Sequence, residues 1–446
     1  MPARPQIANA FGDAAAWLAV AIWLYVWVSL TPFRDLSVAP QTLTADLHSN
    51  TLNQIAAIVV FAATMTFGLR ADVRPLLLRP LGLILIVFAW LALTTMLGQA
   101  GIGGARRLVL MMMMTAVASA FLLLPRDEKQ LSGIFALCAL VVLGLCYFGV
   151  AALPGLSIHQ ATDPLEPLLA GDWRGLFNHK NDAALSMALL VFVGLYVARV
   201  RSRALGWTVA LLALIFVFKS GGKTAIALVP ATLLFAFFIE RGNLFWRALV
   251  MLFVVGGTSV LTLGATVVPA LAGLGDALGI DTTFTGRSDV WAIAFDGIRA
   301  QPVFGYGYGG FWGTEDLVYG FREETSWAVT APSAHNTYVE ILLMGGVVAL
   351  ALVLIWVVLL PLRDLSRAVA RRGPTPLLRL YTRLWVFCLV YAGMESIFLT
   401  PNGIAWFMAL VAIFGLRLEA RAHRRIGQPA LAAAAGPEDL PGMARG

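Results

Sequence analysis

Apolar runs of membrane-spanning length recur along the chain from residue 14 to residue 416, and most of the polar connections between them are short. A bilayer core requires roughly 20 apolar residues per crossing helix, so this pattern predicts an all-α integral membrane protein with about twelve spans. The first range lacks a small-residue cleavage site, and we expect it to be retained as a helix. The predicted spans are residues 14–33, 51–69, 81–98, 107–124, 131–153, 182–198, 204–218, 224–239, 246–268, 337–361, 380–399 and 403–416.

One connection departs from this pattern because it is long. Residues 269–336 separate the ninth and tenth predicted spans, and long loops in compact proteins are usually functional or disordered. We therefore predict one polytopic membrane domain over residues 1–425 with this long loop inside it. Residues 426–446 are rich in Ala, Pro and Gly and are predicted to be a disordered tail.

Composition supports the membrane assignment and removes several other classes. Hydrophobic residues make up 59% of the chain and charged residues 13%, which is too little polar surface to cover a soluble protein of this size. The three cysteines lie inside apolar runs without metal-ligand spacing, so we expect them to be packing residues. No soluble basic domain with interleaved aromatic residues is present in the sequence, and no nucleic-acid partner is expected.

Basic residues predict the orientation. An even number of spans puts both termini on one side, and the loops of that side hold 22 of the 32 Lys and Arg residues. By the positive-inside rule that side is cytoplasmic. Orientation does not require the ten basic residues left on the other side, and such external cations at a membrane surface favour an anionic ligand. They are Arg34, Arg106, Arg107, Arg174, Lys180, Lys219, Lys223, Arg287, Arg299 and Arg322.

Two short outer segments concentrate polar groups. Residues 171–182 place Arg174, His179, Lys180 and Asn181 at the mouth of a span. An interfacial belt of snorkelling cations would explain the two cations, but it does not explain the histidine or the amide. Residues 219–224 resemble the end of a nucleotide-binding loop, but such a loop requires a glycine where Val217 stands. A phosphate cradle and a plain hairpin turn, both presenting Lys219 and Lys223, remain open for this segment.

The long outer loop contains two further candidates. Apolar residues between 290 and 298 recur at helical spacing, and Ser288 or Asp289 could cap the start of that helix. Arg287 would then stand at the positive end of a helix dipole, which favours anion binding. The glycine-rich residues 305–310 are predicted to form a flexible turn. His335 lies at the entrance of the next span, where an imidazole suits proton transfer near neutral pH and a structural role is the alternative.

In order and sidedness, these motifs resemble the O-antigen ligase and polysaccharide polymerase superfamily. The resemblance rests on RGxFxHKN at residues 174–181, the basic loop at 219–224, TGRxxxW at 285–291, PxxGxG at 302–307 and SAHNxY at 333–338. It implies an inverting glycosyltransferase of the bacterial inner membrane, with cytoplasmic termini and a periplasmic active site. It also implies transfer of a glycan from an undecaprenyl diphosphate carrier to a sugar hydroxyl, with no nucleotide sugar, metal or other cofactor.

The same resemblance assigns roles to residues. Arg174 and Arg287 would hold the diphosphate, and His335 would act as base or orient the acceptor. The other polar residues of the motifs are the expected substrate-binding set: His179, Lys180, Asn181, Lys219, Lys223, Asn336 and Tyr338. The adjacent His179 and Lys180 are closer to exopolysaccharide polymerases of the succinoglycan type, which favours a polymerase of repeat units.

Two alternatives remain open from sequence. A ligase would use the same donor site and deliver the glycan to lipid A core, whereas a polymerase is expected to work with chain-length regulator and export proteins. A flippase or transporter of anionic lipid or solute is the alternative of another class. Its best support is Glu395 inside the eleventh predicted span, because an intramembrane acid can relay protons.

Overall fold

The protein is all-helical in the part of the chain that the computed structural model describes, apart from one isolated β-bridge between Ile158 and Trp173. The described residues are 4–37, 51–69, 74–164, 166–257, 259–260, 263–264, 287–314, 317 and 327–421. The first helices are α1 (Arg4–Val28), α2 (Thr51–Gly68), α3 (Arg74–Leu81), α4 (Ile84–Leu97), α5 (Gly101–Phe121), α6 (Glu128–Ala152), α7 (Pro154–Ser157) and the short η1 (Pro167–Leu169). The middle helices are α8 (Lys180–Val200), α9 (Arg203–Lys219), α10 (Lys223–Arg241), α11 (Leu244–Leu252), the π-helix η2 (Phe253–Gly257), α14 (Arg287–Ala300) and η3 (Trp327–Thr330). The last helices are α16 (Thr337–Leu354), the π-helix η4 (Ile355–Leu359), α17 (Leu360–Arg372), α18 (Pro376–Tyr391) and α19 (Ile404–Arg421).

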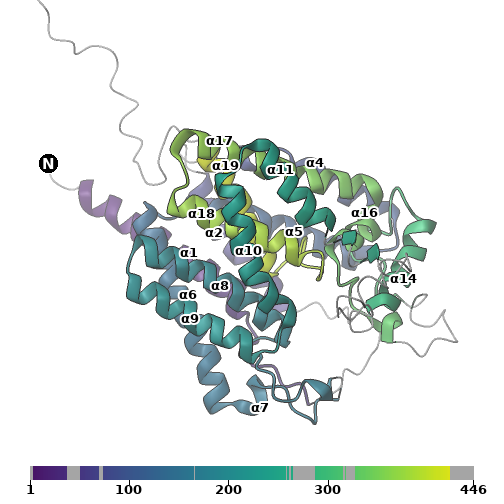
Figure 1. Cartoon of the computed structure of the whole chain (residues 1–446). Coiled ribbons are helices and arrows are strands. Elements are labelled where there is room, and N and C mark those ends of the chain that lie inside the picture. Colours follow the sequence, from purple (N-terminus) through teal and green to yellow (C-terminus); the bar gives the residue numbers. More distant parts are fainter. Residues whose placement is uncertain are drawn as a thin grey trace, which may run out of the picture.

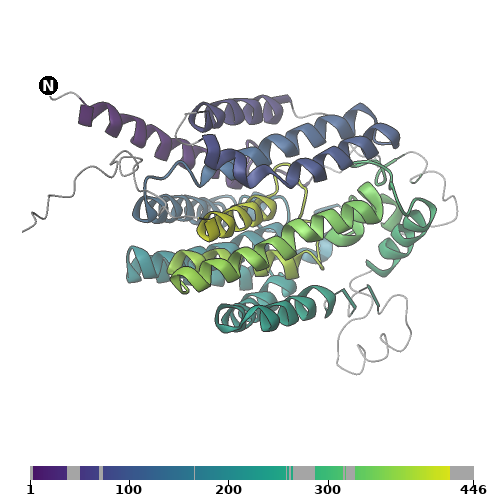
Figure 2. The same cartoon turned by 90° about the horizontal axis from the view of Figure 1, so that it is seen from above.

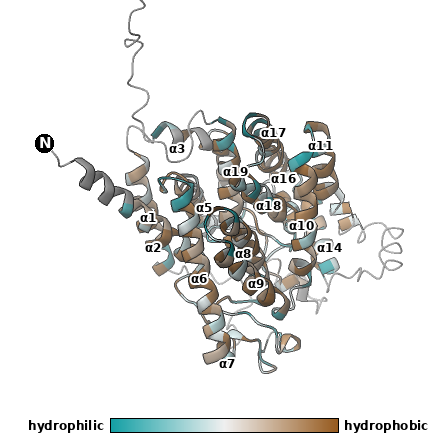
Figure 3. Cartoon of the chain, turned by 60° about the vertical axis from the view of Figure 1, so that its left-hand side comes forward, coloured by the Kyte–Doolittle hydropathy of each residue, from teal (hydrophilic) through white to brown (hydrophobic). Residues whose placement is uncertain are grey.

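Every predicted span overlaps a helix of the structure, and six helical segments are long and apolar enough to cross a membrane by length and composition. The helices lie roughly along one direction in Figure 2, with the N-terminus and α14 at opposite ends of the bundle. Hydrophobic residues colour most of the length of the long helices in Figure 3, while α17 carries many hydrophilic ones. The six segments are Thr51–Gly68, Gly101–Phe121, Glu128–Ala152, Lys180–Val200, Lys223–Arg241 and Thr337–Arg372.

At two predicted span ends the helix of the structure ends elsewhere than the apolar run does. The tenth span was placed at 337–361, but the helix continues through α17 to Arg372. In α17 the apolar face is buried while arginines point outward, so the hydropathy falls although the helix goes on. The eleventh span was placed at 380–399, but α18 ends at Tyr391 and residues 392–403 form a turn before α19. Glu395 therefore lies in a turn and not inside a helix.

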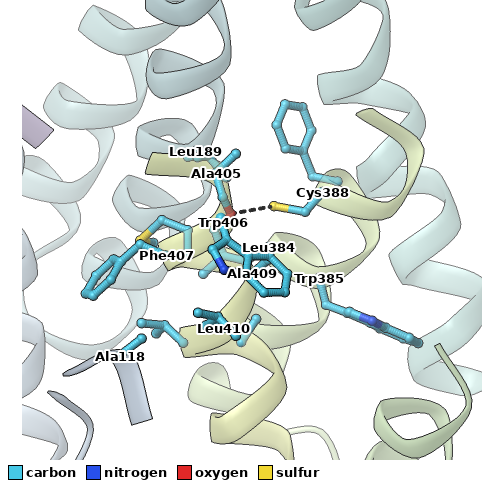
Figure 4. Packing of buried hydrophobic residues seen from close by; sticks show 14 of the residues in the cluster. Ala118, Leu189, Leu384, Trp385, Cys388, Ala405, Trp406, Phe407, Ala409 and Leu410 are labelled. Atoms are coloured by element: carbon cyan, nitrogen blue, oxygen red, sulfur yellow. Dashed lines mark hydrogen bonds between the residues drawn. The ribbon is translucent and has the colours of Figure 1, made fainter. Parts of the chain in front are cut away.

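The most buried helices are α8, α18 and α19, which run through the middle of the bundle (Figure 1). Their side chains interlock with those of α5, as Figure 4 shows for Ala118, Leu189, Leu384 and Trp406. All three cysteines are buried and free, and Cys388 donates a weak hydrogen bond from its thiol to the Ala405 carbonyl at 3.6 Å. The prediction that the cysteines are packing residues is consistent with these positions.

The glycine-rich residues 305–310 are not a loose turn. The Tyr306 amide donates to the Leu343 carbonyl of α16 at 2.7 Å, and the Tyr308 amide donates to the Thr95 hydroxyl of α4 at 3.0 Å. Gly346 adopts a positive φ of 66° and breaks α16, and a Cβ at this position would collide with the Val303 carbonyl. This segment therefore holds the end of α14 against α4 and α16.

Four connections gather at one end of the bundle, which we call the Glu395 end. They are the α7–α8 connection, the α9–α10 turn, the start of α14 and the α18–α19 turn. The Trp173 amide donates to the Lys219 carbonyl at 3.0 Å, which joins the first two. An ion pair of 2.5 Å between Arg287 and Glu395 joins the other two.

Candidate functional site

Glu395 is the centre of the polar cluster at the Glu395 end. Its Oε1 atom accepts from the Arg287 Nη2 at 2.5 Å and from the Asn181 Nδ2 at 3.3 Å, and its Oε2 atom lies 2.8 Å from the His335 Nδ1. These partners come from the start of α14, the first turn of α8 and the residues preceding α16. Arg287, His335 and Glu395 each keep about a fifth of the side chain exposed. The structure thus brings three predicted site residues to one carboxylate.

The charge of Glu395 decides which nitrogen of His335 can act as a base. Burial alone would raise the pKa of the Glu395 carboxyl, but the His335 hydrogen bond and the Arg287 charge outweigh it, and the pKa is lowered. The group is ionised at neutral pH and can only accept hydrogen bonds. His335 must therefore donate from Nδ1, so the lone pair of the neutral imidazole is on Nε2. This is the arrangement that orients a histidine general base.

The α18–α19 turn that carries Glu395 is fastened to the start of α16. The Thr337 hydroxyl donates to the Glu395 carbonyl at 2.8 Å and accepts from the Ile397 amide at 2.9 Å. The Asn336 Nδ2 donates to the Gly393 carbonyl at 2.9 Å. The position of the Glu395 carboxylate therefore depends on packed backbone contacts and not on a free loop.

Two predicted substrate-binding residues, Asn336 and Tyr338, contribute to this scaffold. The side-chain oxygen of Asn336 caps α16 by accepting from the Tyr338 and Val339 amides at 3.0 and 3.2 Å, and Asn336 has no exposed surface. The Tyr338 hydroxyl donates to the Leu389 carbonyl at 3.0 Å, and its side chain is buried. Both polar groups are thus satisfied inside the protein, and a substrate-binding role for Asn336 and Tyr338 stays a prediction.

His335 is held in an unusual backbone conformation. Its φ is 46°, in the left-handed region that a non-glycine residue occupies at a cost of about 1–3 kcal/mol. The preceding residue, Ala334, is held on both sides of its backbone. The Ala334 carbonyl accepts from the Trp291 indole at 2.8 Å, and the Ala334 amide donates to the Glu340 carboxylate at 2.8 Å. Strain of this kind is often found where a side chain must be aimed at a reacting group.

Arg287 differs in one respect from the prediction. It is the first residue of α14, so Ser288 and Asp289 lie in the first turn and are not caps before it. The guanidinium donates to the Met394 carbonyl through Nη1 and to Glu395 through Nη2. An arginine has five N–H donors, and these two contacts leave others to meet an anion. Thr285 and Gly286 of the same motif lie outside the described residues.

A second polar cluster adjoins the first through Asn181. The His179 Nε2 pairs with the Glu166 Oε2 at 3.0 Å, and the His179 Nδ1 accepts from the Asn181 amide at 3.0 Å, which caps α8. Burial alone would lower the pKa of His179, but Glu166, aided by Asp182 and Glu395, outweighs it and the pKa is raised. The hydrogen bond from His179 in turn lowers the pKa of Glu166. The Lys180 side chain points to another partner and forms an ion pair of 2.6 Å with Asp172.

The remaining predicted cations differ in burial and in the contacts that they make. Arg174 is almost fully buried and donates to the Phe177 carbonyl at 3.1 Å and to the Arg34 carbonyl at 2.8 Å. These contacts give it a role in folding the connection between α7 and α8, and as a phosphate ligand it stays a prediction. Lys219 is exposed and lies 5.9 Å from the Trp173 ring centroid, and Lys223 is exposed at the start of α10.

Sequence reasoning missed Glu395 as a site residue, as well as His159, Asp163 and Glu166. Glu395 carried a usable signal, because an acid in an apolar run on the same side as Arg287 could have been paired with it. The other three lie in a connection where only their proximity in space singles them out. The ligand atoms of His159, Glu166 and His179 lie within 4.8 Å of one another, so among the described residues they form a group that could hold a metal ion, although no metal was expected.

The fold and site are those of a polytopic membrane protein with a histidine–carboxylate–arginine cluster at one end of its helices. Residues 187–354 match the family model described as O-antigen ligase. No curated protein matches the chain. The matched region contains Arg287 and His335, so the resemblance to the O-antigen ligase and polymerase superfamily is confirmed for this part of the chain. The match indicates glycan transfer of the O-antigen ligase or polymerase type on lipid-linked substrates.

Proposed function

We propose that this protein transfers a glycan from an undecaprenyl diphosphate carrier to a sugar hydroxyl at the periplasmic face of the bacterial inner membrane, and thereby polymerises surface or exopolysaccharide repeat units. The single observation that carries the proposal is the Glu395 carboxylate, which orients His335 at 2.8 Å and holds Arg287 at 2.5 Å. A base and a cation beside each other suit a reaction that removes a proton from one substrate and leaves negative charge on the other.

In the proposed reaction, the acceptor hydroxyl attacks the anomeric carbon while its proton passes to the His335 Nε2. The bond between the anomeric carbon and the diphosphate oxygen breaks, and the electron pair leaves with the carrier. Attack from the face opposite the diphosphate inverts the anomeric configuration. No nucleotide sugar is consumed, because the carrier diphosphate is itself the leaving group.

Arg287 is the proposed ligand of the leaving diphosphate. Negative charge grows on the departing oxygen, and a guanidinium fixed in place stabilises that charge without reorganising. Its planar fork can contact two phosphate oxygens at once. The exposed Lys219 and Lys223, which flank the turn between α9 and α10, would add positive potential for the carrier headgroup.

The preference for a polymerase over a ligase rests on the resemblance of the His179-Lys180 pair to exopolysaccharide polymerases. Both reactions need the same donor site, so the acceptor must be identified by experiment. The transport alternative loses its main support, because Glu395 lies in a turn at a helix end. Its carboxylate already contacts Arg287, His335 and Asn181.

The proposal is tested by reconstituting the purified protein in vesicles with lipid-linked repeat units, with and without lipid A core. Polymerisation gives a ladder of lipid-linked products, and ligation gives a conjugate with lipid A core. His335→Gln should lower turnover by about 10²–10⁴-fold, because an amide can form hydrogen bonds but cannot take up the proton. Arg299→Gln, on the exposed face of α14, is the matched control and should retain activity.

If wild-type protein inserts correctly but forms neither product, the proposed glycan transfer is rejected. Full turnover in His335→Gln would reject the base assignment alone, and His179 would become the next candidate. Release of the donor on the far side of the vesicle without any glycosidic product would instead support the transport alternative.

A further inference from the structure

The connection between α7 and α8 contains a cluster that the proposed reaction does not use. His159, Glu166 and His179 each offer a donor atom, and these atoms lie within 4.8 Å of one another. We propose that this cluster binds one divalent transition-metal ion of the Zn²⁺ class. Two imidazole nitrogens and one carboxylate oxygen form a ligand set that zinc accepts readily, while Mg²⁺ and Ca²⁺ prefer oxygen alone.

The spacing of the donor atoms is close to what the ion requires. Ligand atoms that sit about 2.0–2.1 Å from a tetrahedral zinc are roughly 3.3 Å apart. The His179 Nε2 and Glu166 Oε2 atoms are 3.0 Å apart, so this pair needs almost no movement to share an ion. The His159 side chain is fully buried, so the remaining shift, on the order of 1.5 Å, falls to the partly exposed His179 and Glu166 side chains.

His159 is already oriented as a ligand. Its Nδ1 lies 3.2 Å from the Asp163 Oδ2, so a proton on Nδ1 leaves the lone pair on Nε2. Metal-binding histidines usually donate their second ring nitrogen to a carboxylate in this way. The His159 Nε2 accepts from the Lys180 amide at 3.3 Å, a long bond that an ion would replace. The His159 and His179 rings lie 5.5 Å apart, close enough to meet at one ion.

A bound ion would join three points of one connection. His159 follows α7, Glu166 precedes η1, and His179 is the residue that caps α8 directly before Asn181, the partner of Glu395. Coordination through Nε2 moves the His179 proton to Nδ1, so the bond from the Asn181 amide is given up while the ion fixes the connection at the edge of the candidate active site. Three protein ligands leave a fourth position of a tetrahedral ion to water or to a ligand from solution.

The test uses the full chain in detergent, purified with a tag that contains no histidine and treated with a chelator. Titration with Zn²⁺ alone should show one saturable site per chain, and Co²⁺ should give the visible absorption of a tetrahedral nitrogen and oxygen site. His159→Gln and His179→Gln should each abolish the site, and Asp163→Asn should weaken it by about 10–100-fold. His335→Gln lies in the other cluster and should bind Zn²⁺ as tightly as wild type.

Glu166→Gln keeps the test decisive if the histidine variants do not fold, because nearly half of this side chain is exposed and the substitution should be tolerated. Loss of the site in this variant supports the proposal. Wild-type Zn²⁺ affinity in folded Glu166→Gln, or no saturable binding to wild-type protein, overturns it and leaves a hydrogen-bonded ion pair. Metal binding is measured without any glycan substrate, so its failure is separate from a failure of the proposed reaction.

Discussion

Replacing Glu395 by glutamine tests the centre of the site while keeping its shape. The change removes the negative charge that contacts Arg287 at 2.5 Å and His335 at 2.8 Å. A glutamine amide can donate to the His335 Nδ1 as well as accept from it, so the imidazole is no longer held with its lone pair on Nε2. The misoriented base should lose most of the advantage of general-base catalysis, which is about 10²–10⁴-fold.

The kinetic signature separates this role from a purely structural one. Arg287 is released from its carboxylate and remains available to the diphosphate, so KM for the lipid-linked donor should stay within about threefold while kcat falls by about 10²–10⁴-fold. Glu395→Asp keeps the charge one methylene further back and should restore part of the rate. Asp296→Asn neutralises an exposed carboxylate of α14 that pairs with Arg299, and it should behave as wild type.

The same variant has a predicted effect on stability. The pKa of Glu395 is lowered in the folded protein, so its ionised form stabilises the fold above its ordinary value of 4.5, and this contribution is lost as the pH falls through the folded value. Wild type should therefore exceed Glu395→Gln in melting temperature at pH 7, and the difference should shrink below about pH 4.5. A Glu395→Gln protein with wild-type kcat and an unchanged pH–rate profile would refute the reasoning.

Three further predictions follow from the same geometry. Arg287→Lys should lower kcat/KM by about 10–100-fold, since an ammonium cannot reproduce the planar fork of a guanidinium. Arg299→Lys, further along α14, should leave kcat/KM unchanged. Equal losses in both variants would remove Arg287 from the site. An impermeant thiol reagent should label Leu168→Cys but not Pro374→Cys in intact spheroplasts, because both positions are exposed and lie on opposite sides in the proposed topology. Wild type gives the background, because its cysteines are buried. The reverse labelling pattern would invert the proposed topology. The pKa of His179 is raised above 6.5, so the stabilising charge of its ion pair with Glu166 is fully present below that pH and is lost as the pH rises through the folded value. Wild type should therefore exceed Glu166→Gln in melting temperature by more below about pH 6.5 than at higher pH, and a pH-independent difference would contradict the ion pair.

Each span predicted from hydropathy overlaps a helix, because a lipid environment forces the backbone to satisfy its own hydrogen bonds and long apolar runs then have no alternative to a helix. Hydropathy could not place the ends that depend on neighbours. The extension of the tenth segment to Arg372 required knowledge of which face of α17 is buried, and the end of α18 at Tyr391 depends on contacts with α16.

For the candidate site, too, the sequence determined one part and the tertiary structure another. Arg287 and His335 could be singled out from sequence because polar residues at a predicted membrane surface need a reason to be there. The contacts of Glu395 could not be predicted, because hydropathy and motif position say nothing about which side chain meets which. Asn181, Arg287 and His335 are far apart in the chain, and only the packing of α8, α14 and α16 around the α18–α19 turn brings them to one carboxylate.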